Sequence, residues 1–537
     1  MVQVETTMSE SEIALRAGIG AEGMEIPASE ACASASALAP AAVTTSAGDS
    51  LSLLKRVVSF PAMLGTMLVG AVFIAGRYFA VDPDLWWHTK VGQNLLATHH
   101  WPTTDPYSFT VAGTPWMAYE WLGDVLFGAV ARFAGLQGLD ALLIVLGSAV
   151  LIALYAYATL RSGKSKAGFV TAATLYVLAT PSFSLRPQML GYLFVILTLI
   201  VLELFRQGKL HAMWFLPPLF LVWINTHGSF IVGLGVIVVY WASGLKAFRL
   251  GGIEARGWNP AERLRLEFVF LLCLAVLPLT PYGTRLAVYP FNMAFGQPVN
   301  VASVLEWQPM PFNMLGGKIF LAFLLGYFGL QVVFAFVWRL EELILFVGGA
   351  ALACLHVRFL LLFVPFFAPI LATILARWLP RYERGKDKYF VNAILMAGVI
   401  GAMVHYFPSM DDLQEKVAKQ FPVRAVEYLR HHRVPGPMFN TYGYGGYLVW
   451  SGQKVFIDGR GDLYEQGGVF SDYMHITLLK PGALAVLQGY HVGSCLLEWS
   501  EPMSTVLSAS PDWKKIYSDN VSALFVRTAA VDPLQLK

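Results

Sequence analysis

Charged side chains are scarce in this chain: Asp, Glu, Lys and Arg make up only 14% of its 537 residues. Soluble globular proteins carry about 25%. The deficit lies mainly between residues 57 and 407, where long apolar runs follow one another, so this part is not a soluble globular protein. The net charge is only +3, and the basic residues lie in short loops between the apolar runs. This distribution gives no basic surface for nucleic acid, and we expect no nucleic-acid partner.

Cysteine is also rare. The four cysteines, Cys32, Cys273, Cys354 and Cys495, fall in four different environments, and two of them lie inside apolar runs. Their spacing therefore excludes a disulfide framework and a zinc-binding motif. A cleavable signal peptide is not evident either, because the first apolar run begins near Val57 and is too long for such a signal.

Three regions differ in composition. Residues 1–50 are rich in Ala, Ser, Thr and Glu and contain few large apolar side chains, which predicts a disordered N-terminal segment. Residues 51–407 are strongly apolar, and the mean hydropathy of the whole chain is +0.56. Residues 408–537 read like an ordinary soluble domain. We therefore predict a multi-spanning membrane domain between a disordered segment and a folded C-terminal domain.

About eleven apolar stretches approach the roughly 20 residues that a membrane-spanning helix needs. These are Val57–Ala80, Gly138–Leu160, Ala167–Thr180, Met189–Phe205, Met213–Ile224, Ser229–Leu245, Leu266–Thr280, Ile319–Trp338, Leu343–Leu355, Phe359–Leu375 and Tyr389–Phe407.

The cations between these stretches alternate in number. If Lys55 and Arg56 are cytoplasmic, every second loop is rich in Lys and Arg and the loops between them hold only scattered cations, as the positive-inside rule requires. The segment Glu120–Leu136 is half apolar, but a crossing there would turn the basic loop 161–166 outward. We therefore place it as an amphipathic or re-entrant helix on the outer face. This topology puts the chain in the inner (cytoplasmic) membrane, with a cytoplasmic N-terminus and a periplasmic C-terminal domain.

The polar residues suited to catalysis gather on the predicted outer face. Ionisable groups at a membrane rim are costly unless they are paired or hydrated, so they are functional candidates. The alternative is that Trp, Tyr and charged residues only anchor the helices at the interface. The candidates are Asp82, Asp84, Trp86, Trp87 and His88 in the outer loop 81–118, then Glu120, Arg186, His227, His356 and Arg358.

Two kinds of binding chemistry follow from these residue types. Arg186 and Arg358 suit a phosphate or diphosphate, because a guanidinium binds two oxygens at once. The pair Asp82 and Asp84, together with Asp105 or Glu120, offers hard oxygen ligands for Mg²⁺ or Mn²⁺, so a divalent metal is an open possibility.

The C-terminal region predicts a small α/β domain. Val423–His431, Tyr473–Leu479 and Ala483–Leu487 have the pattern of helices. The stretches PMFNTY, KVFIDG and HVGSCLLEW read as strands, and WKKIYSDNVSALFVR reads as a hairpin that turns at Ser518-Asp519-Asn520.

Residues 57–205 resemble the GT-C class of glycosyltransferases that use lipid-linked sugars. An outer loop with acidic residues directly follows the first span, and the segment EWLGDVLFGAVARFAGL precedes a span and a basic turn. This order, with the later SLRPQ turn, is similar to the protein mannosyltransferase and aminoarabinose transferase branch. More faintly, FNTYGYGGYLVWSGQKVFIDGR resembles the start of the outer domain of oligosaccharyltransferase catalytic subunits. Asn440, Thr441 and Tyr442 replace the W-W-D of that family's motif, so recognition of its acceptor sequence does not carry over.

The resemblance implies transfer of a sugar, with inversion, from a polyprenyl-phosphate-linked donor in the membrane to an acceptor glycan, lipid or protein. It places the catalytic base at Asp84 or Asp82, with Asp84 favoured because Pro83 fixes the backbone between them. Arg186 and Arg358 would bind the phosphate, with His227 and His356 as helpers. Trp86 and Trp87 would stack on the sugar, and His88 and Glu120 would complete the substrate site.

Other functions remain open. A transporter or flippase would have charges near mid-span and inverted repeats, and neither is found. A polymerase or ligase of lipid-linked glycans would favour one large late outer loop, whereas Tyr282–Lys318 is modest in length. A non-catalytic membrane protein is compatible with the sequence.

Overall fold

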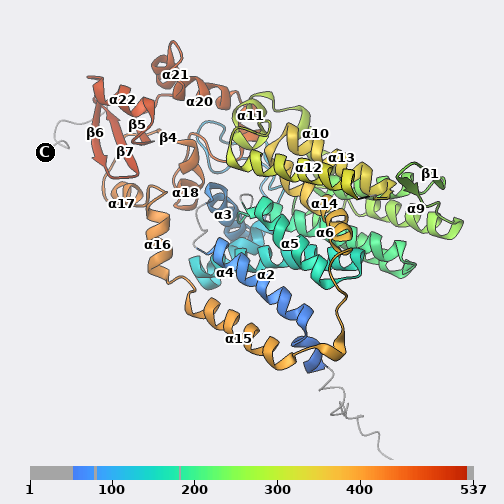
Figure 1. The fold of residues 1–537 in the computed structure, drawn as a ribbon. Helices are drawn as coiled ribbons and strands as arrows, with labels where there is room; N and C mark the ends of the chain where they lie inside the picture. The colour runs from blue at the N-terminus through green and yellow to red at the C-terminus, as the bar shows by residue number, and fades with distance from the viewer. Residues whose placement is uncertain (1–52, 78–81, 181–182, 335, 529–537) are drawn as a thin grey trace, which may run out of the picture. The chain divides into compact units, whose positions relative to one another are not determined.

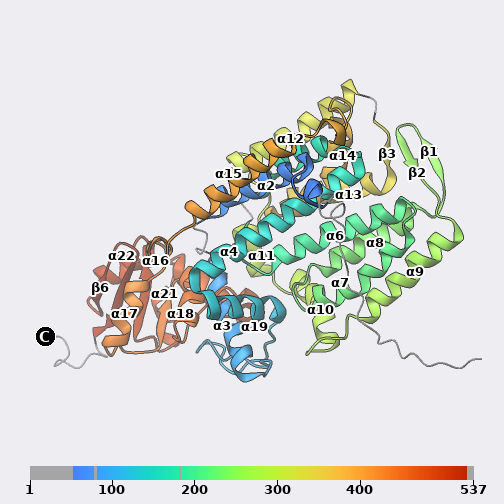
Figure 2. The same cartoon turned by 90° about the horizontal axis from the view of Figure 1, so that it is seen from below.

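A computed structural model of the chain describes residues 53–77, 82–180, 183–334 and 336–528. The predicted N-terminal segment 1–50, the end of the first predicted span and Cys32 lie outside the described residues. From Leu54 onward the chain packs as one compact unit of helices and two small sheets, and Figures 1 and 2 show this unit in two views.

Each of the eleven predicted spans contains helix. The helices are α2 (Phe60–Gly76), the second half of α4 (Trp121–Ser162), α5 (Ser165–Ala179), α6 (Gln188–Arg206), η2 (Leu210–Phe215) with α7 (Leu216–Ile224), α8 (Phe230–Ser243), α9 (Pro260–Ala275), α12 (Leu315–Val333), α13 (Leu340–Leu355), α14 (Leu360–Leu375) and α15 (Tyr389–His405).

These helices make the chain a polytopic α-helical membrane protein. Within the described residues, four helical segments are long and apolar enough to cross a membrane, and α15 with the following helix gives a fifth if the bent pair is one span. Four shorter apolar helices accompany them: Phe60–Gly76, Ser165–Ala179, Leu210–Ile224 and Phe230–Ser243. The helices thus agree with the predicted segments, whereas the number of eleven crossings stays a prediction.

The segment 81–118, predicted as an outer loop, is partly helical. Helix α3 spans Pro83–Thr98, and the side chain of Asp82 caps its N-terminus by accepting a hydrogen bond from the backbone N–H of Asp84. Proline is favoured in the first helical turn, where its missing N–H has no helical partner. The predicted amphipathic segment is the first half of α4, which kinks at Gly135, where φ is 58°.

Helices α3 and α4 cross closely because glycines face each other at the crossing. A Cβ atom on Gly92 of α3 would lie 1.8 Å from the carbonyl oxygen of Asp124, and one on Gly128 of α4 would lie 2.5 Å from the carbonyl carbon of Gly92. Only glycine permits this approach of the two backbones. It brings His88, one turn before Gly92, beside Asp124.

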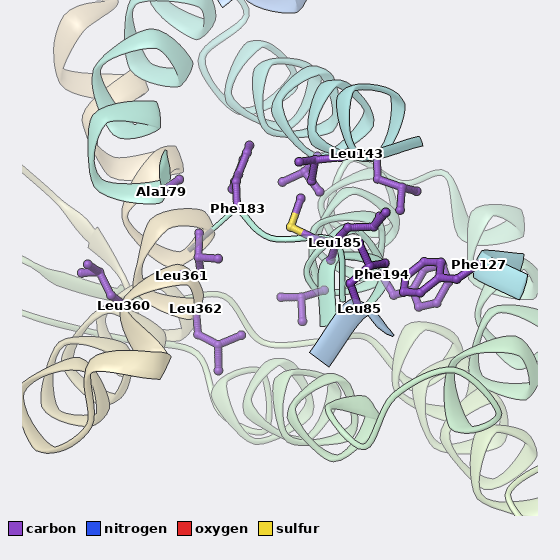
Figure 3. Close-up of a cluster of buried hydrophobic side chains, with 14 of the residues drawn as sticks. Leu85, Phe127, Leu143, Ala179, Phe183, Leu185, Phe194, Leu360, Leu361 and Leu362 are labelled. Atoms are coloured by element: carbon purple, nitrogen blue, oxygen red, sulfur yellow. The ribbon is translucent and has the colours of Figure 1, made fainter. Parts of the chain in front are cut away.

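Leucines and phenylalanines from several helices form the core beneath these helices. Figure 3 shows one buried cluster that combines Leu85 of α3, Phe127 and Leu143 of α4, Phe194 of α6, and the leucines at the start of α14. Leu185 joins the cluster, so the turn that carries Arg186 rests on buried apolar contacts. Such dense packing holds the polar residues above it in fixed positions.

The charges that the topology assigns to the cytoplasmic side contact one another. Arg161 pairs with Glu342 at 2.5 Å, Arg339 pairs with Glu203 at 2.7 Å, and Arg206 pairs with Glu341. These residues come from the ends of α4, α6 and α13 that share one predicted side. Nearby, β1 (Phe248–Leu250), β2 (Ile253–Ala255) and β3 (Trp338–Arg339) form a short sheet. Which side of a membrane this end faces stays a prediction.

The C-terminal part combines short helices with a four-stranded sheet of order β4-β5-β7-β6. Strands β4 and β5 are parallel, and β6 and β7 form the predicted antiparallel hairpin. The elements are α16 (Met410–Ala418), α17 (Val423–His431), β4 (Met438–Asn440), η6 (Tyr442–Tyr444), α18 (Gly445–Trp450), α19 (Gly461–Gln466), α20 (Val469–Thr477), α21 (Ala483–Gly489), β5 (Ser494–Glu498), α22 (Pro502–Ala509), β6 (Trp513–Ser518) and β7 (Ser522–Arg527).

One strand prediction is wrong. The stretch KVFIDG is not part of the sheet and forms a single parallel bridge between Val455 and Ser108. Its backbone is paired with the loop after α3: the N–H of Phe109 donates to the carbonyl of Val455 at 3.0 Å. The apolar residues that suggested a strand, Val455, Phe456 and Ile457, are buried in this contact.

Candidate functional site

Three carboxylates surround the guanidinium of Arg186. Its Nε lies 2.8 and 2.9 Å from the two carboxylate oxygens of Asp82, and its Nη1 lies 3.1 Å from Asp84 and 3.0 Å from Glu306. Asp82 caps α3, Arg186 precedes α6 (Gln188–Arg206), and Glu306 belongs to the short helix η3 (Leu305–Trp307). The structure thus brings together Asp82, Asp84, Arg186 and Glu306, whereas their position on an outer face stays a prediction.

This arrangement does not fit a metal ion. The side chain of Arg186 occupies the space in which Asp82 and Asp84 would converge on a cation. Among the described residues, no group of three or more His, Cys, Asp and Glu side chains is placed to hold a metal. As arranged, the two carboxylates are ligands of a guanidinium. Because the guanidinium of Arg186 already pairs with these carboxylates, it is a poor ligand for a phosphate in this arrangement.

Asp82 and Asp84 differ in how their oxygens are used. Both oxygens of Asp82 accept hydrogen bonds from Arg186, and one of them also caps α3. Asp84 makes longer contacts, 3.1 Å to Arg186 and 3.1 Å to the indole N–H of Trp87. Burial raises the pKa of Asp84 to about 6, helped by the charges of Asp82 and Glu306 and opposed by Arg186. A carboxylate with this pKa is ionised at neutral pH and is basic enough to accept a proton.

The C-terminal region closes over Asp84. A Cβ atom on Gly459 would lie 1.8 Å from Asp84 Oδ1, and one on Gly446 would lie 2.1 Å from the carbonyl oxygen of Pro83. Both glycines belong to the segment that we compared with the start of an oligosaccharyltransferase outer domain. Gly446 and Gly459 therefore allow this segment to pack closely against the start of α3.

A second group centres on Glu120, the residue that precedes α4. Its Oε2 lies 3.5 Å from Nε2 of His88, and its Oε1 lies 3.3 Å from Nε2 of His227. On its other side, Nδ1 of His88 lies 2.6 Å from Oδ1 of Asp124. The four side chains form a row in the order Asp124, His88, Glu120, His227, and all are largely enclosed.

The protonation of this row follows from its environment. Burial raises the pKa of Glu120 to about 8, with a further rise from the charge of Asp84. Burial and the positive charge of Arg358 lower the pKa of His227 to about 3, and burial holds the pKa of His88 well below its ordinary value. At neutral pH, Glu120 therefore carries a proton and both histidines are neutral.

The hydrogen bonds assign the tautomers. Nδ1 of His227 accepts from the backbone N–H of Ser229 at 3.0 Å, so its proton lies on Nε2 and points to Glu120. Burial raises the pKa of Asp124 well above its ordinary value, with a further rise from the charge of Glu120, which favours its neutral form. The row therefore holds Glu120 in place through the 2.6 Å contact of Asp124 with His88 without charging either imidazole.

Arg358 is the guanidinium that remains available. Its guanidinium carbon lies 4.0 Å from the centre of the Trp307 ring, and Nδ1 of the neighbouring His356 lies 2.5 Å from the carbonyl oxygen of Trp307. Within the described part of the chain, no ion pair joins Arg358 to a carboxylate. Its charge acts on Glu120 and His227, so it belongs to the same site.

The two tryptophans differ from the prediction that they stack on a sugar. Trp86 is 1% exposed and packs against Phe421, Tyr447 and Trp450, with ring centres 5.1–5.4 Å apart. Trp87 is also buried, with its ring 3.6 Å from that of His88. As placed, neither ring offers a free face to a ligand, because the helical spacing of α3 turns both residues into the core.

Trp307, Tyr289 and Asp462 were not singled out from the sequence, and Asp124 and Glu306 stood among its outer-face polar residues without an assigned role. Asp124 had one usable signal, a carboxylate in the first turn of an apolar helix. Tyr289 and Asp462 meet across 173 positions in the sequence, with the tyrosine hydroxyl 2.9 Å from Asp462 Oδ2. No sequence pattern indicates such a contact.

Comparisons with known proteins give structural likenesses only. No protein-family model matches the chain, and no curated protein matches its sequence. The archaeal oligosaccharyltransferase AglB from Archaeoglobus fulgidus, in complex with an inhibitory peptide and a dolichol-phosphate, aligns with a TM-score of 0.47 and 10% identity. That alignment covers 87% of this chain and 74% of AglB. An oligosaccharyltransferase structure from the same organism with Zn and sulfate gives 0.46 and 11%, over 83% of this chain and 69% of that one.

A second kind of neighbour is ArnT from Cupriavidus metallidurans bound to undecaprenyl phosphate. The TM-score is 0.46 and the identity 13%, over 91% of this chain and 100% of ArnT. AglB and ArnT are GT-C glycosyltransferases, the class that the sequence resembles. With TM-scores below 0.5 and identities of 10–13%, these likenesses decide neither the reaction of this chain nor the residues that perform it.

Proposed function

We propose that this protein is a membrane glycosyltransferase that moves a sugar from a polyprenyl-phosphate-linked donor to an acceptor hydroxyl or amine on the outer face. The observation that carries the proposal is the site itself. Two buried carboxylates with raised pKa values, about 6 for Asp84 and about 8 for Glu120, lie together with Arg358, which forms no ion pair with a carboxylate of the described residues.

Each group has a place in such a reaction. Asp84 accepts the proton of the acceptor, whose oxygen or nitrogen then forms a bond to the anomeric carbon. The bond from that carbon to the phosphate oxygen breaks, and the phosphate leaves with the electron pair. Arg358 stabilises the departing phosphate, because its fork donates to two oxygens and Trp307 holds it flat. Asp82 and Arg186 fix the start of α3 and hold Asp84 in position.

Protonated Glu120 fits beside the phosphate for an electrostatic reason. A second ionised carboxylate next to Asp84 and the phosphate would repel both, whereas a carboxylic acid donates a hydrogen bond. The row of His88 and Asp124 on one side and His227 on the other fixes this acid and takes no charge itself. We further propose that residues 408–537 form the extracytoplasmic domain that closes this site.

The direct test is turnover of defined donors. We expect the purified chain in lipid nanodiscs to release polyprenyl phosphate from labelled polyprenyl-phosphate sugars. Arg358→Ala should lower kcat/KM by about 10²-fold, the usual loss when one group that stabilises developing negative charge is removed. Arg358→Lys should recover part of the loss, because lysine keeps the charge without the planar fork.

The control is Arg132→Ala, which removes an exposed arginine from the first half of α4. This variant should turn over donors at the wild-type rate. No release of polyprenyl phosphate from any donor of a broad panel would refute the proposed function. Equal rates for Arg358→Ala and Arg132→Ala would refute the role of Arg358.

The pKa of Glu120 gives a pH prediction. If the protonated form is active, kcat/KM falls as the pH rises through about 8, where Glu120 loses its proton next to Asp84, Arg358, Arg186 and Asp462. Glu120→Gln keeps a neutral hydrogen-bond donor, so it should retain activity and lose this alkaline fall. We would measure kcat/KM from pH 5 to 10 for both proteins. An unchanged alkaline limb in Glu120→Gln would assign the fall to another group.

A further inference from the structure

A cavity of about 690 Å³ lies beside the proposed active site and is not used by the reaction described above. It is bounded by the loop after α3, by α10 (Thr284–Phe295) and by the start of α19 (Gly461–Gln466). Its volume falls within the roughly 300–1,000 Å³ of sites that bind small organic ligands.

The cavity contains a buried carboxylate with unused capacity. Asp462 is 6% exposed, and its Oδ2 accepts a hydrogen bond from the hydroxyl of Tyr289. Backbone N–H groups of Asp462 and Leu463 also act on this carboxylate and lower its pKa, although burial raises it overall, and Oδ1 makes no side-chain hydrogen bond among the described residues. A buried carboxylate oxygen without a partner is costly, so a ligand that donates a hydrogen bond to it would be stabilised.

The other walls combine flat aromatic faces with hydrogen-bonding groups. Trp116, Tyr282 and Tyr289 supply the aromatic surface, and Asn292, Gln466 and Arg285 supply donors and acceptors at the more exposed side. A ligand with one apolar face and many hydroxyl groups matches this lining, because each hydroxyl both donates and accepts. Sugars have this chemistry.

The walls of the cavity also support the residues just before Glu120. The Tyr289 ring stacks on Tyr119 with centres 4.3 Å apart. The Tyr282 hydroxyl accepts a hydrogen bond from the backbone N–H of Ala118 at 3.0 Å. A ligand in the cavity would therefore lie next to the chain segment that carries Glu120 into the site.

We propose that this cavity binds the acceptor, and that the acceptor is a carbohydrate. That the bound molecule is an acceptor rests on the proposed function, whereas carbohydrate binding in the cavity does not depend on it. Asp462 accepts a hydrogen bond from a sugar hydroxyl, the aromatic side chains pack against the sugar ring, and Asn292 and Gln466 bind further hydroxyls. The hydroxyl that receives the new sugar points toward Asp84 and Glu120.

Binding is tested first without a donor. Methyl glycosides of hexoses and N-acetylhexosamines would be titrated against the full chain in nanodiscs and followed by ligand-observed NMR. We expect at least one glycoside to bind and Asp462→Asn to weaken it about ten-fold or more. Asn292→Ala, on the exposed side of α10, should weaken glycoside binding without disturbing Asp462. This second variant tests the site even if Asp462→Asn misfolds.

The matched control is Asp472→Asn, outside the cavity. Asp472 also accepts a hydrogen bond from a tyrosine hydroxyl, that of Tyr490, at 2.6 Å. It should bind glycosides as the wild type does. The same variants would then be given donor and glycoside, with transfer and donor hydrolysis measured together. We expect Asp462→Asn to lower the ratio of transfer to hydrolysis, and Asp472→Asn to leave it unchanged.

The outcomes separate the two proposals. Glycoside binding that is absent in the wild type, or unaffected by Asp462→Asn and Asn292→Ala, overturns the carbohydrate site. Transfer to peptides with none to glycosides overturns the carbohydrate acceptor, and leaves both the glycosyltransferase and carbohydrate binding in the cavity intact. Binding of glycosides with no release of polyprenyl phosphate from any donor overturns the proposed reaction and supports the site.

Discussion

Replacing Asp84 by asparagine is expected to lower the rate of sugar transfer by about 10³-fold, within the range that a positioned general base contributes. The amide cannot accept the acceptor's proton, yet it keeps the size of the side chain and can still accept from Trp87. In the wild type, the pKa of Asp84 near 6 predicts a rate that rises with pH through this value as the base is freed of its proton. The asparagine variant should lack this acidic limb in its residual activity.

Asp82→Asn is the matched control, because it makes the same chemical change two residues earlier. Asparagine caps a helix as well as aspartate does, so α3 should stay intact. We expect a smaller loss than in Asp84→Asn, caused by a weaker hold on Arg186. Initial rates for the two variants over a pH series decide between the carboxylates. A larger loss in Asp82→Asn would make Asp82 the base, and no loss in either would refute a base at this site.

Amino-acid pattern alone predicted the helical part of the fold well. A long apolar run can be recognised within each segment alone, and the alternating number of cations in the loops supports the boundaries. All eleven predicted stretches contain helix. Helix α3 was missed because the residues after the first span were read as a polar loop. Its signals were present, since Asp82 and Pro83 are a typical cap and first residue.

The site was predictable only in part. Residues at the ends of neighbouring helices were expected on one face, and Asp82, Asp84 and Arg186 do meet. The pattern could not show that Arg186 binds three carboxylates, while Arg358 pairs with none of the carboxylates that the structure describes. That distribution depends on Glu306, which reaches Arg186 across 120 positions. Likewise, the tryptophans looked exposed beside a membrane exit, whereas the C-terminal residues Phe421 and Tyr447 cover Trp86.

The contact between the loop after α3 and the C-terminal region depends on one arginine. Arg460 is fully buried, and its guanidinium lies 2.7 Å from Asp105 and 2.6 Å from Asp458. The ring of Trp116 lies 4.7 Å from the guanidinium carbon, which adds a cation–π contact. Burial acts to raise the pKa of Asp105, but Arg460 and the hydrogen bond from Ser108 outweigh it and lower that pKa below its ordinary value.

Arg460→Met should therefore destabilise the folded protein by about 3–5 kcal/mol, the usual cost of removing one partner of a buried ion pair. The variant leaves two buried carboxylates without their cation. The pKa of Asp105 in the folded state then rises, so stability is lost as the pH increases. The wild-type pair behaves oppositely, because the lowered pKa of Asp105 contributes stability that is lost only as the pH falls. The deficit of Arg460→Met should thus be largest at neutral and alkaline pH and shrink near pH 4.

Thermal unfolding of the detergent-purified proteins between pH 4 and 8 measures this deficit. The control is Arg263→Met, which breaks an exposed pair with Glu267 one helical turn away, and such pairs contribute at most about 1 kcal/mol. Adding Asp105→Asn to Arg460→Met removes one of the stranded charges and should restore part of the stability. Because the same contact closes the C-terminal region over Asp84 through Gly459, sugar transfer should fall together with stability in Arg460→Met and return together with it in the double variant. An Arg460→Met protein as stable as Arg263→Met at pH 8 would show that packing, without the buried charges, holds the two regions together.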